Sequence, residues 1–209
     1  MSDDNLVQGS IEWRLARCGK VTASRIGDLM AKTKSGWGAS RVNYMAELIA
    51  EKLTGIPADS YTSAAMQWGN DTEPMARSAY QFYADTDVLE VGFIQHGFIS
   101  ESGASPDGLV GTAGLVELKC PNTATHIETL LGGNVPNKYV LQMQWQMACT
   151  NRIWCDFASF DPRMPESMRL FVRRLERDSE GIKQIEQAVT EFLEEREATI
   201  ARLQMRLMG

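Results

Sequence analysis

Two carboxylates and one lysine are close neighbours between residues 105 and 121. Asp107 follows a proline, and Glu117 and Lys119 come ten and twelve residues later. Glu117 and Lys119 lie two residues apart in a segment with the alternation of a strand, so their side chains share one face. Carboxylate oxygens are ligands of Mg²⁺ and Mn²⁺, and a lysine can orient or help deprotonate an attacking water. This spacing therefore predicts hydrolysis assisted by a divalent metal ion.

A β-hairpin is the element that must bring these side chains together. Residues 109–110 can start one strand, Gly111 and Gly114 permit a reversal, and residues 115–120 form the second strand, which returns to the end where Asp107 stands. One face of the second strand carries the charged pair together with a leucine, and we expect the other, apolar face to be the core. The opposing interpretation is that the charged pair lies on an ordinary solvated strand face. The expected core face consists of Val116, Leu118 and Cys120.

The order of these residues resembles a known signature. Pro106-Asp107 followed by Glu117-Leu-Lys119 on the next strand resembles the motif of the PD-(D/E)XK nucleases. The segments Ser105-Pro-Asp-Gly-Leu109 and Leu115-Val-Glu-Leu-Lys-Cys-Pro121 are similar to those of the phage lambda-type exonucleases, the viral recombinase branch of that superfamily. The resemblance implies an α+β fold with a PD-(D/E)XK core, in which a central mixed β-sheet is flanked by helices.

Length and composition predict a single domain over residues 1–209, which the resemblance implies is a nuclease domain. Hydrophobic residues make up 44% of the chain and charged residues 23%, as is typical of a folded globular protein. We expect residues 1–10 to form a flexible tail, and residues 178–207 to form a long C-terminal helix that could pack on a neighbouring subunit. No apolar run reaches the length of a membrane span, and the polar start lacks the features of a signal peptide.

The cysteines and histidines indicate neither a zinc site nor a disulfide framework. The four cysteines include no Cys-x-x-Cys pair, and the chain has two histidines. The simplest expectation is a reducing cytoplasm, that of the bacterial host if a phage encodes the chain.

Glu73 is a third acidic candidate. It stands with Pro74 at the start of a helix expected over residues 72–84, where a carboxylate and a proline are both favoured for structural reasons alone. The segment Trp68-Gly-Asn-Asp-Thr-Glu73 resembles the first motif of the family, however, and this favours a role at the metal site.

A glutamine on a later helix is a further candidate. We expect a helix from Pro136 to about Thr150. Within Tyr139-Val-Leu-Gln142, Gln142 matches a family glutamine that contacts the active site. The superfamily pattern also has a tyrosine four residues further on, and here Gln146 stands in that place.

The resemblance implies a role for each of these residues. Lys119 would position the attacking water, and Gln142 would support it. The expected cofactor is Mg²⁺, with two ions in each active site and Mn²⁺ able to substitute, because two metals stabilise both the attacking and the leaving oxygen. The implied metal ligands are Glu73, Asp107, Glu117 and the main-chain carbonyl of Leu118.

The charges are unevenly distributed along the chain. The formal net charge is −6, yet residues 14–52 carry eight lysines and arginines against three acidic residues. This asymmetry predicts a basic binding site on an acidic body, although a basic solvated face would have the same composition.

Part of this basic segment resembles a phosphate-binding element. Residues 13–24 are similar to the segment that holds the DNA 5′-phosphate in the family, and Thr22 or Ser24 could cap a short helix over residues 25–31. The opposing view is that the arginine of this segment forms an ordinary surface ion pair with Glu12 or Asp28. The residues that match the 5′-phosphate pocket are Arg17, Ser24 and Ser105.

Two more residues match DNA-contacting positions. Lys34, in a loop expected over residues 32–39, could reach the duplex backbone or the minor groove. Met66 occupies the place of an apolar wedge that separates the terminal base pair, although a methionine is more often buried in the core.

The remaining pattern completes the expected fold. We expect a helix from Ser40, as its cap, to Leu53, closed by Gly55. Its expected buried stripe consists of Val42, Met45, Leu48, Ile49 and Leu53. A short helix should begin at Asn122 or Thr123. Strands are expected within residues 88–100 (two, with a turn near Gly97), 153–160 and 168–175.

By resemblance, the chain would degrade one strand of linear double-stranded DNA from 5′ to 3′. It would release mononucleotides and leave a 3′ single-stranded overhang for phage recombination by strand annealing. The implied partners are double-stranded DNA ends, two further copies of the chain in a ring-shaped homotrimer, and a phage single-strand annealing protein. Two alternatives stay open: a non-catalytic subunit that binds DNA ends, and a related endonuclease.

Overall fold

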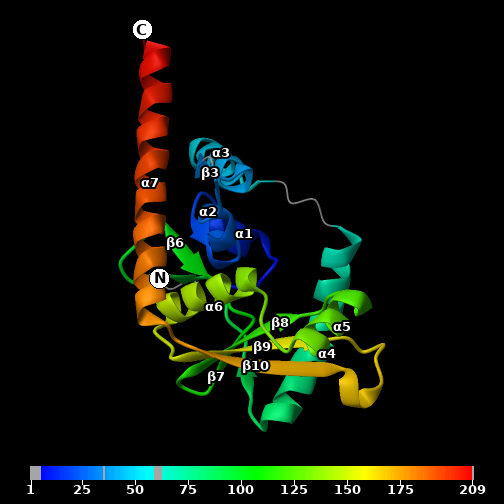
Figure 1. Cartoon of the computed structure of the whole chain (residues 1–209). Helices are drawn as coiled ribbons and strands as arrows, with labels where there is room; N and C mark the ends of the chain where they lie inside the picture. The colour runs from blue at the N-terminus through cyan, green and yellow to red at the C-terminus, as the bar shows by residue number, and fades with distance from the viewer. Residues whose placement is uncertain (1–5, 35, 59–62, 209) are drawn as a thin grey trace.

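The computed structural model describes residues 6–34, 36–58 and 63–208. Its centre is a five-stranded sheet in the order β10-β9-β8-β7-β4. The strands β8 (Gly114–Lys119) and β9 (Trp154–Phe160) are parallel. The strands β10 (Leu170–Glu176), β7 (Gly108–Val110) and β4 (Val88–Leu89) run antiparallel to their partners. The expected central mixed sheet with flanking helices is confirmed (Figure 1).

Helices cover both faces of this sheet. The chain passes from β8 to its parallel neighbour through α5 (Thr123–Gly132) and α6 (Asn137–Thr150), because parallel strands require a crossover connection. The helix α6 lies on one face and α4 (Ala64–Ala84) on the other (Figure 1). Leu115 packs with residues of α6, whereas Val116 and Leu118 pack with residues of α4. The expectation that only one face of the second hairpin strand is core is therefore wrong, since strands next to crossovers are buried on both sides.

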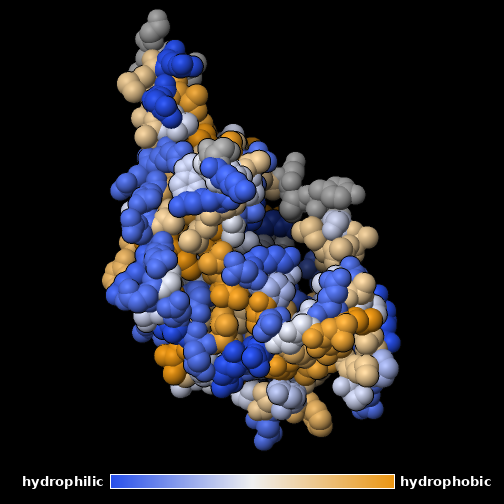
Figure 2. All heavy atoms as spheres, in the orientation of Figure 1, coloured by the Kyte–Doolittle hydropathy of each residue, from blue (hydrophilic) through white to orange (hydrophobic). Residues whose placement is uncertain are grey.

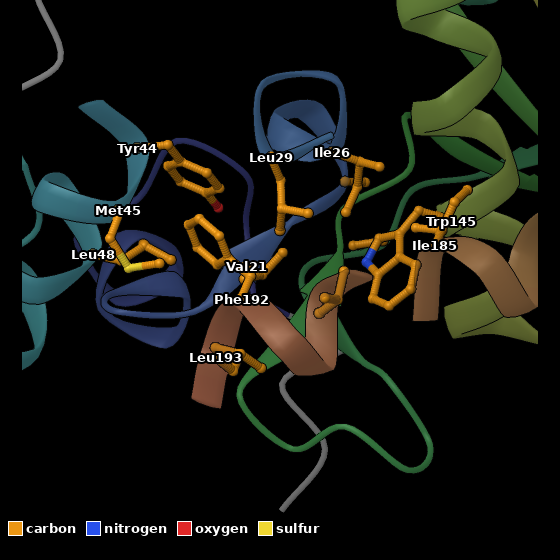
Figure 3. Packing of buried hydrophobic residues seen from close by; sticks show 13 residues of the cluster. Val21, Ile26, Leu29, Tyr44, Met45, Leu48, Trp145, Ile185, Phe192 and Leu193 are labelled. Atoms are coloured by element: carbon orange, nitrogen blue, oxygen red, sulfur yellow. The ribbon is translucent and has the colours of Figure 1, made fainter. Parts of the chain in front are cut away.

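A second core joins the N-terminal segments to the last helix. A small sheet of β1 (Val21–Thr22), β6 (Ser102–Ala104) and β5 (Ile94–Gln95) packs with α3 (Ala39–Thr54) and α7 (Ser179–Met208). Figure 3 shows the side chains that fill the space between these elements and α6. They include Val21, Ile26, Leu29, Tyr44, Trp145, Ile185 and Phe192.

The helix α4 begins earlier than the pattern predicts. It starts at Ala64 because the Ser63 side chain caps it by accepting a hydrogen bond from the Met66 main-chain N–H. Pro74 is tolerated inside the helix, and the Ser78 hydroxyl bonds to its carbonyl at 2.9 Å. Glu73 therefore lies in the middle of a long helix, and the structural explanation that placed it in a first turn is wrong.

The helix α3 is confirmed, and so is part of its expected buried stripe, since Met45 and Leu48 are buried and Ile49 packs against the same core. Val42 and Leu53 are instead 58% and 51% exposed, and the buried face also includes Arg41 and Tyr44. Its N-cap residue is a glycine without a side-chain hydrogen bond, so Ser40 is not the cap. Gly55 ends the helix in the left-handed conformation, as predicted.

Short elements account for the other differences. The loop expected over residues 32–39 contains a small hairpin of β2 (Lys32–Thr33) and β3 (Gly36–Trp37). The helix expected over residues 25–31 is a 3-10 turn, η2 (Ala23–Arg25), followed by α2 (Ile26–Leu29), and neither is capped by a side chain. The strands expected within residues 88–100 are present as β4 and β5, but they belong to different sheets, and β6 was not predicted. A second 3-10 turn, η3, spans Glu166–Met168.

The first described residues are bonded to the body of the protein, whereas the last helix extends past it. Residues 1–5 of the expected tail lie outside the described residues, whereas the Gln8 side chain donates hydrogen bonds to the carbonyls of Val91 and Pro106, both at 2.9 Å. Ser10 then caps α1 (Ile11–Arg17). The predicted long C-terminal helix is confirmed as α7, which extends past the other elements in Figure 1. Among the residues described, no helix is long and apolar enough to cross a membrane.

Candidate active site

The hairpin places Asp107, Glu117 and Lys119 at one point. β7 and β8 pair antiparallel with Gly108 opposite Val116, which sets Asp107 beside Glu117. The Leu118 main-chain N–H donates to the Asp107 Oδ2 atom at 2.7 Å, and the Lys119 ammonium forms an ion pair with the Glu117 Oε1 atom. Gly108 lets β4 lie against this hairpin, because an added Cβ would lie 2.0 Å from a Val88 methyl group. The hairpin geometry thus produces the predicted cluster.

Glu117 is fully buried rather than solvated. The helix α6 covers it and supplies two amide donors: Gln142 Nε2 to the Oε1 atom and Gln146 Nε2 to the Oε2 atom, both at 2.5 Å. The interpretation of this pair as a solvated strand face is therefore wrong.

Glu73 approaches the cluster from the opposite helix. Arg77, one turn further along α4, donates from Nη2 to the Glu73 Oε1 atom at 2.6 Å and to the Asp107 carbonyl at 3.3 Å. Its Nη1 atom pairs with Glu90 at 2.7 Å. Arg77 thereby links α4 to the start of β7 and holds the third carboxylate beside the first two.

The electrostatics of the cluster show an excess of negative charge. Burial raises the pKa of Asp107 well above its usual value, and the neighbouring Glu117 carboxylate raises it further. Burial also raises the pKa of Glu73, even though Arg77 and Lys119 act in the opposite direction. Burial alone would lower the pKa of Lys119, but the carboxylates of Glu117 and Asp107 outweigh it and raise that pKa. The Lys119 ammonium is therefore held as a cation, but its single positive charge does not balance the carboxyl groups of Asp107, Glu117 and Glu73.

A cavity of about 710 Å³ opens next to this cluster. Residues of α1, the segment 18–25, α3 and α4 line it, including Arg17, Ser24, Met66, Glu73 and Arg77. Figure 2 shows the surface hollowed between the N-terminal elements and α4. Glu73 and Arg77 belong both to the cavity wall and to the acidic cluster, so the two sites are continuous.

Arg17 is held in the cavity wall by a hydrogen bond and an aromatic contact. Its Nη1 atom donates to the Ser105 hydroxyl at 3.0 Å, and its guanidinium lies 4.1 Å from the centre of the Trp13 ring. Burial lowers the pKa of Arg17 to about 10. Within the described parts of the chain Arg17 forms no salt bridge, and Asp28 pairs with Arg25 instead. The surface ion pair offered as the alternative for Arg17 is therefore wrong.

The other predicted contact residues differ in their placement. Ser24 is exposed and lines the cavity, but it is not a helix cap. Thr22 is the N-cap residue of η2, but its side chain makes no capping hydrogen bond. Met66 is 50% exposed on the first turn of α4 and also lines the cavity, so it is not a core methionine. Lys34 lies exposed in the turn between β2 and β3, outside the cavity lining.

Residues 12–153, more than half of the chain, match the YqaJ-like viral recombinase domain. The chain belongs to this family. Its structure is also similar to that of an alkaline exonuclease (LHK-Exo) from Laribacter hongkongensis, with 52% identity and a TM-score of 0.89 over 95% of this chain and 98% of that chain. A second structure of LHK-Exo, in complex with dAMP, gives the same values. A phage-related exonuclease from Haemophilus somnus 129PT, at 16% identity, shares the fold with a TM-score of 0.70 over 88% of this chain and 96% of that chain. A search of curated proteins found no match.

In this YqaJ-like chain, the resemblance seen in the sequence is confirmed, and so is the fold that it implies. The acidic cluster does not form a ready-made metal cage. Among the described residues, no three histidine, cysteine, aspartate or glutamate side chains converge closely enough to hold a metal ion. The donor chemistry nevertheless fits a hard divalent cation, because buried carboxylates with raised pKa values would be stabilised by an added positive charge. Asp107 and Glu117 are the residues that could hold it, with Glu73 as the third carboxylate.

Gln146 and Arg77 are the residues that sequence reasoning missed. Gln146 stands four residues after Gln142, a spacing that puts both amides on one face of a helix. Arg77 stands four residues after Glu73, the spacing of an ion pair within a helix. Both signals were present in the sequence, but each depends on knowing which face of the helix meets the hairpin.

Proposed function

We propose that this chain is a Mg²⁺-dependent deoxyribonuclease that degrades one strand of linear double-stranded DNA from 5′ to 3′. The observation that carries the proposal is the meeting of Asp107, Glu117 and Lys119 beside a cavity whose wall contains Arg17, a half-buried arginine with no carboxylate partner among the described residues. The similarity to LHK-Exo, a named alkaline exonuclease also solved with dAMP, supports nuclease chemistry with mononucleotide products. The remaining strand would carry a 3′ overhang for recombination by strand annealing.

The proposed chemistry is attack of water on a phosphodiester bond. Mg²⁺, as two ions in each site or with Mn²⁺ in its place, would supply charge for the attacking and leaving oxygens. Asp107, Glu117 and the Leu118 carbonyl are the proposed ligands, and Glu73 completes the set directly or through water. Lys119 would orient the attacking water, since its ammonium lies at the Glu117 carboxylate. The amide of Gln142 would keep that carboxylate in place.

The cavity supports selection of one strand end. A terminal phosphate is an anion that a guanidinium and hydroxyl groups bind well. Arg17 and Ser105 already contact each other, and Ser24 faces the same cavity. A 5′-phosphate bound there would lie beside the acidic cluster. We further propose that Met66 separates the terminal base pair and that Lys34 contacts the duplex backbone.

The assembly that we propose is a homotrimeric ring around DNA, working with a phage single-strand annealing protein. The last turns of α7 support self-association, because they extend past the other elements and expose Leu203 and Met205 by 43% and 65%. Sedimentation equilibrium at micromolar concentration checks this: a mass of three chains is expected, and a monomer alone would contradict it.

The activity is tested with linear and covalently closed circular duplexes, each with Mg²⁺, Mn²⁺ or EDTA. Linear duplexes carry a label at either the 5′ or the 3′ end. We expect early release of the 5′ label as a mononucleotide, later loss of duplex, and intact circles. Cutting of the circles would identify an endonuclease instead. Binding of ends without any cutting would identify a non-catalytic end-binding subunit.

A further inference from the structure

The two oxygens of the Glu117 carboxylate are not equally occupied. Oε1 accepts hydrogen bonds from the Lys119 ammonium and from Gln142, whereas Oε2 accepts only from Gln146 among the described residues. Each carboxylate oxygen has about two lone-pair sites. Oε1 is therefore filled by protein donors, and Oε2 keeps one site available. A cation that binds Glu117 would be expected at Oε2.

Gln146 determines where Oε2 points. Its side chain is fully buried, and its Nε2 atom on α6 donates to the Glu117 Oε2 atom at 2.5 Å. The amide cannot turn over without placing its carbonyl oxygen against a carboxylate, and that carbonyl faces the Cys155 thiol at 3.9 Å. A neighbouring strand and helix thus fix the amide, and the amide fixes the plane of the carboxylate.

We propose that Gln146 is a positioning residue that orients Glu117 for metal binding through Oε2. This inference rests on the proposed metal-dependent function and adds a residue to it. Gln146 does not touch the substrate. Its effect is to hold the carboxylate in the orientation that the metal requires, so that binding needs no rearrangement in a closely packed interior. Outer-shell donors of this kind typically change metal affinity about 10–100-fold.

The test measures direct binding of Mn²⁺ to the protein without DNA. The electron paramagnetic resonance signal of free Mn²⁺ reports how much of the ion remains unbound. We expect Gln146→Met to raise the dissociation constant about 10–100-fold. Gln144→Met is the matched control, because Gln144 lies on the same helix, is also buried, and bonds to the Glu176 carbonyl and the Asp178 N–H away from the site. The control should lose stability but keep the affinity for Mn²⁺.

Each outcome decides the inference. Equal Mn²⁺ affinity in wild type and Gln146→Met would overturn it and leave the proposed nuclease function intact. An equal loss of affinity in Gln144→Met would also overturn it, because the effect would then come from the packing of α6. No Mn²⁺ binding by the wild type would overturn both the inference and the metal dependence. If Gln146→Met does not fold, Gln146→Asn keeps an amide that is too short to reach Oε2, and the same loss of affinity is expected.

Discussion

The acidic cluster and the cavity beside it are built in opposite ways. Asp107, Glu117 and Lys119 come from one hairpin, and two amides of the neighbouring helix α6 donate to the Glu117 carboxylate. Arg17 and Ser105, in contrast, meet across 88 residues of chain, and the arginine has no carboxylate partner among the described residues. The protein thus gathers more carboxylates than cations in one site and, among the described residues, leaves the Arg17 guanidinium without a carboxylate partner in the other.

This difference indicates what each site requires from outside. The carboxyls of Asp107 and Glu73 have raised pKa values, so the acidic cluster would be stabilised by a cation. The half-buried guanidinium of Arg17, whose pKa is lowered, would be stabilised by an anion. Under the proposed function, a phosphate ester with bound metal ions would supply both charges at once, so that the two sites would serve one substrate.

The largest expected effect is loss of chemistry at the acidic cluster. Asp107→Ala and Glu117→Ala should each lower the rate of nucleotide release by roughly 10³-fold or more, because the metal supplies several kcal/mol of transition-state stabilisation. The fold should persist in Asp107→Ala, since the substitution removes one of several carboxylates that repel each other. Rates are measured at saturating Mg²⁺, with circular dichroism as the check of folding. Vigorous digestion by Asp107→Ala would contradict the assignment.

Lys119→Ala separates metal binding from water activation within the same cluster. Activity should be lost while Mn²⁺ binding is mostly retained, because the ammonium is not a ligand. The measurement pairs the rate of nucleotide release with a Mn²⁺ binding isotherm. Loss of both in parallel would show that the lysine mainly maintains the structure of the site.

A smaller effect is expected in the cavity. Arg17→Ala should remove most of the preference for a 5′-phosphorylated over a 5′-hydroxyl duplex. The ratio of the two rates should fall about 10–100-fold, because a hydrogen bond to a charged group contributes about 1.5–3 kcal/mol. Arg17→Lys should restore it only partly, because an ammonium lacks the planar fork. Arg173→Ala is the control and should keep the preference, because Arg173 is exposed on β10 and lies outside the cavity lining. Equal rates of the wild type on 5′-phosphorylated and 5′-hydroxyl duplexes would contradict the role of Arg17 in holding the 5′-phosphate.

The sheet that carries the acidic cluster should also respond to acid. Burial alone would raise the pKa of Asp161, at the end of β9, but hydrogen bonds from Arg163 and Thr123 outweigh it and lower the pKa to about 2 from 3.8. A depressed pKa means that the ionised carboxylate stabilises the fold above about pH 4 and that this contribution is lost as the pH falls towards about 2. The contribution is on the order of 2 kcal/mol.

Asp161→Asn tests this by removing the titrating group. The free energy of unfolding should fall by about 2 kcal/mol at neutral pH, and its slope between about pH 4 and 2 should flatten. Chemical denaturation across that range gives the measurement. A slope equal to that of the wild type would place the acid sensitivity elsewhere. The 5′-phosphate preference at neutral pH should be unchanged, because Asp161 does not line the cavity.

The smallest effect is expected at the cavity rim. Met66→Ala should slow digestion of a fully paired blunt end by up to about fivefold, or about 1 kcal/mol, and should have no effect on an end that is already frayed. Met75→Ala is matched to it, since Met75 is on the same helix, is 53% exposed and lies outside the cavity lining. Equal slowing by both substitutions, or on both kinds of end, would contradict a wedge role.

The sequence alone determined the local parts of this protein. The alternation from Leu115 to Lys119 and the glycines around it define the hairpin, because strand period and turn chemistry are properties of neighbouring residues. The stop of α3 at Gly55 and the cap of α5 by Asn122 were predictable for the same reason. The family resemblance extended this to the order of the fold.

Only the tertiary structure decided what covers each element. Glu117 is buried because α6 crosses over β8. No pattern within the strand distinguishes a charged face that a helix covers from one that is solvated. The pairing of Gln146 with that carboxylate and the contact of Arg17 with Ser105 depend on segments distant in the chain. Helix faces and crossovers set such contacts, and burial then fixes which charges are compensated by the protein and which remain for a ligand.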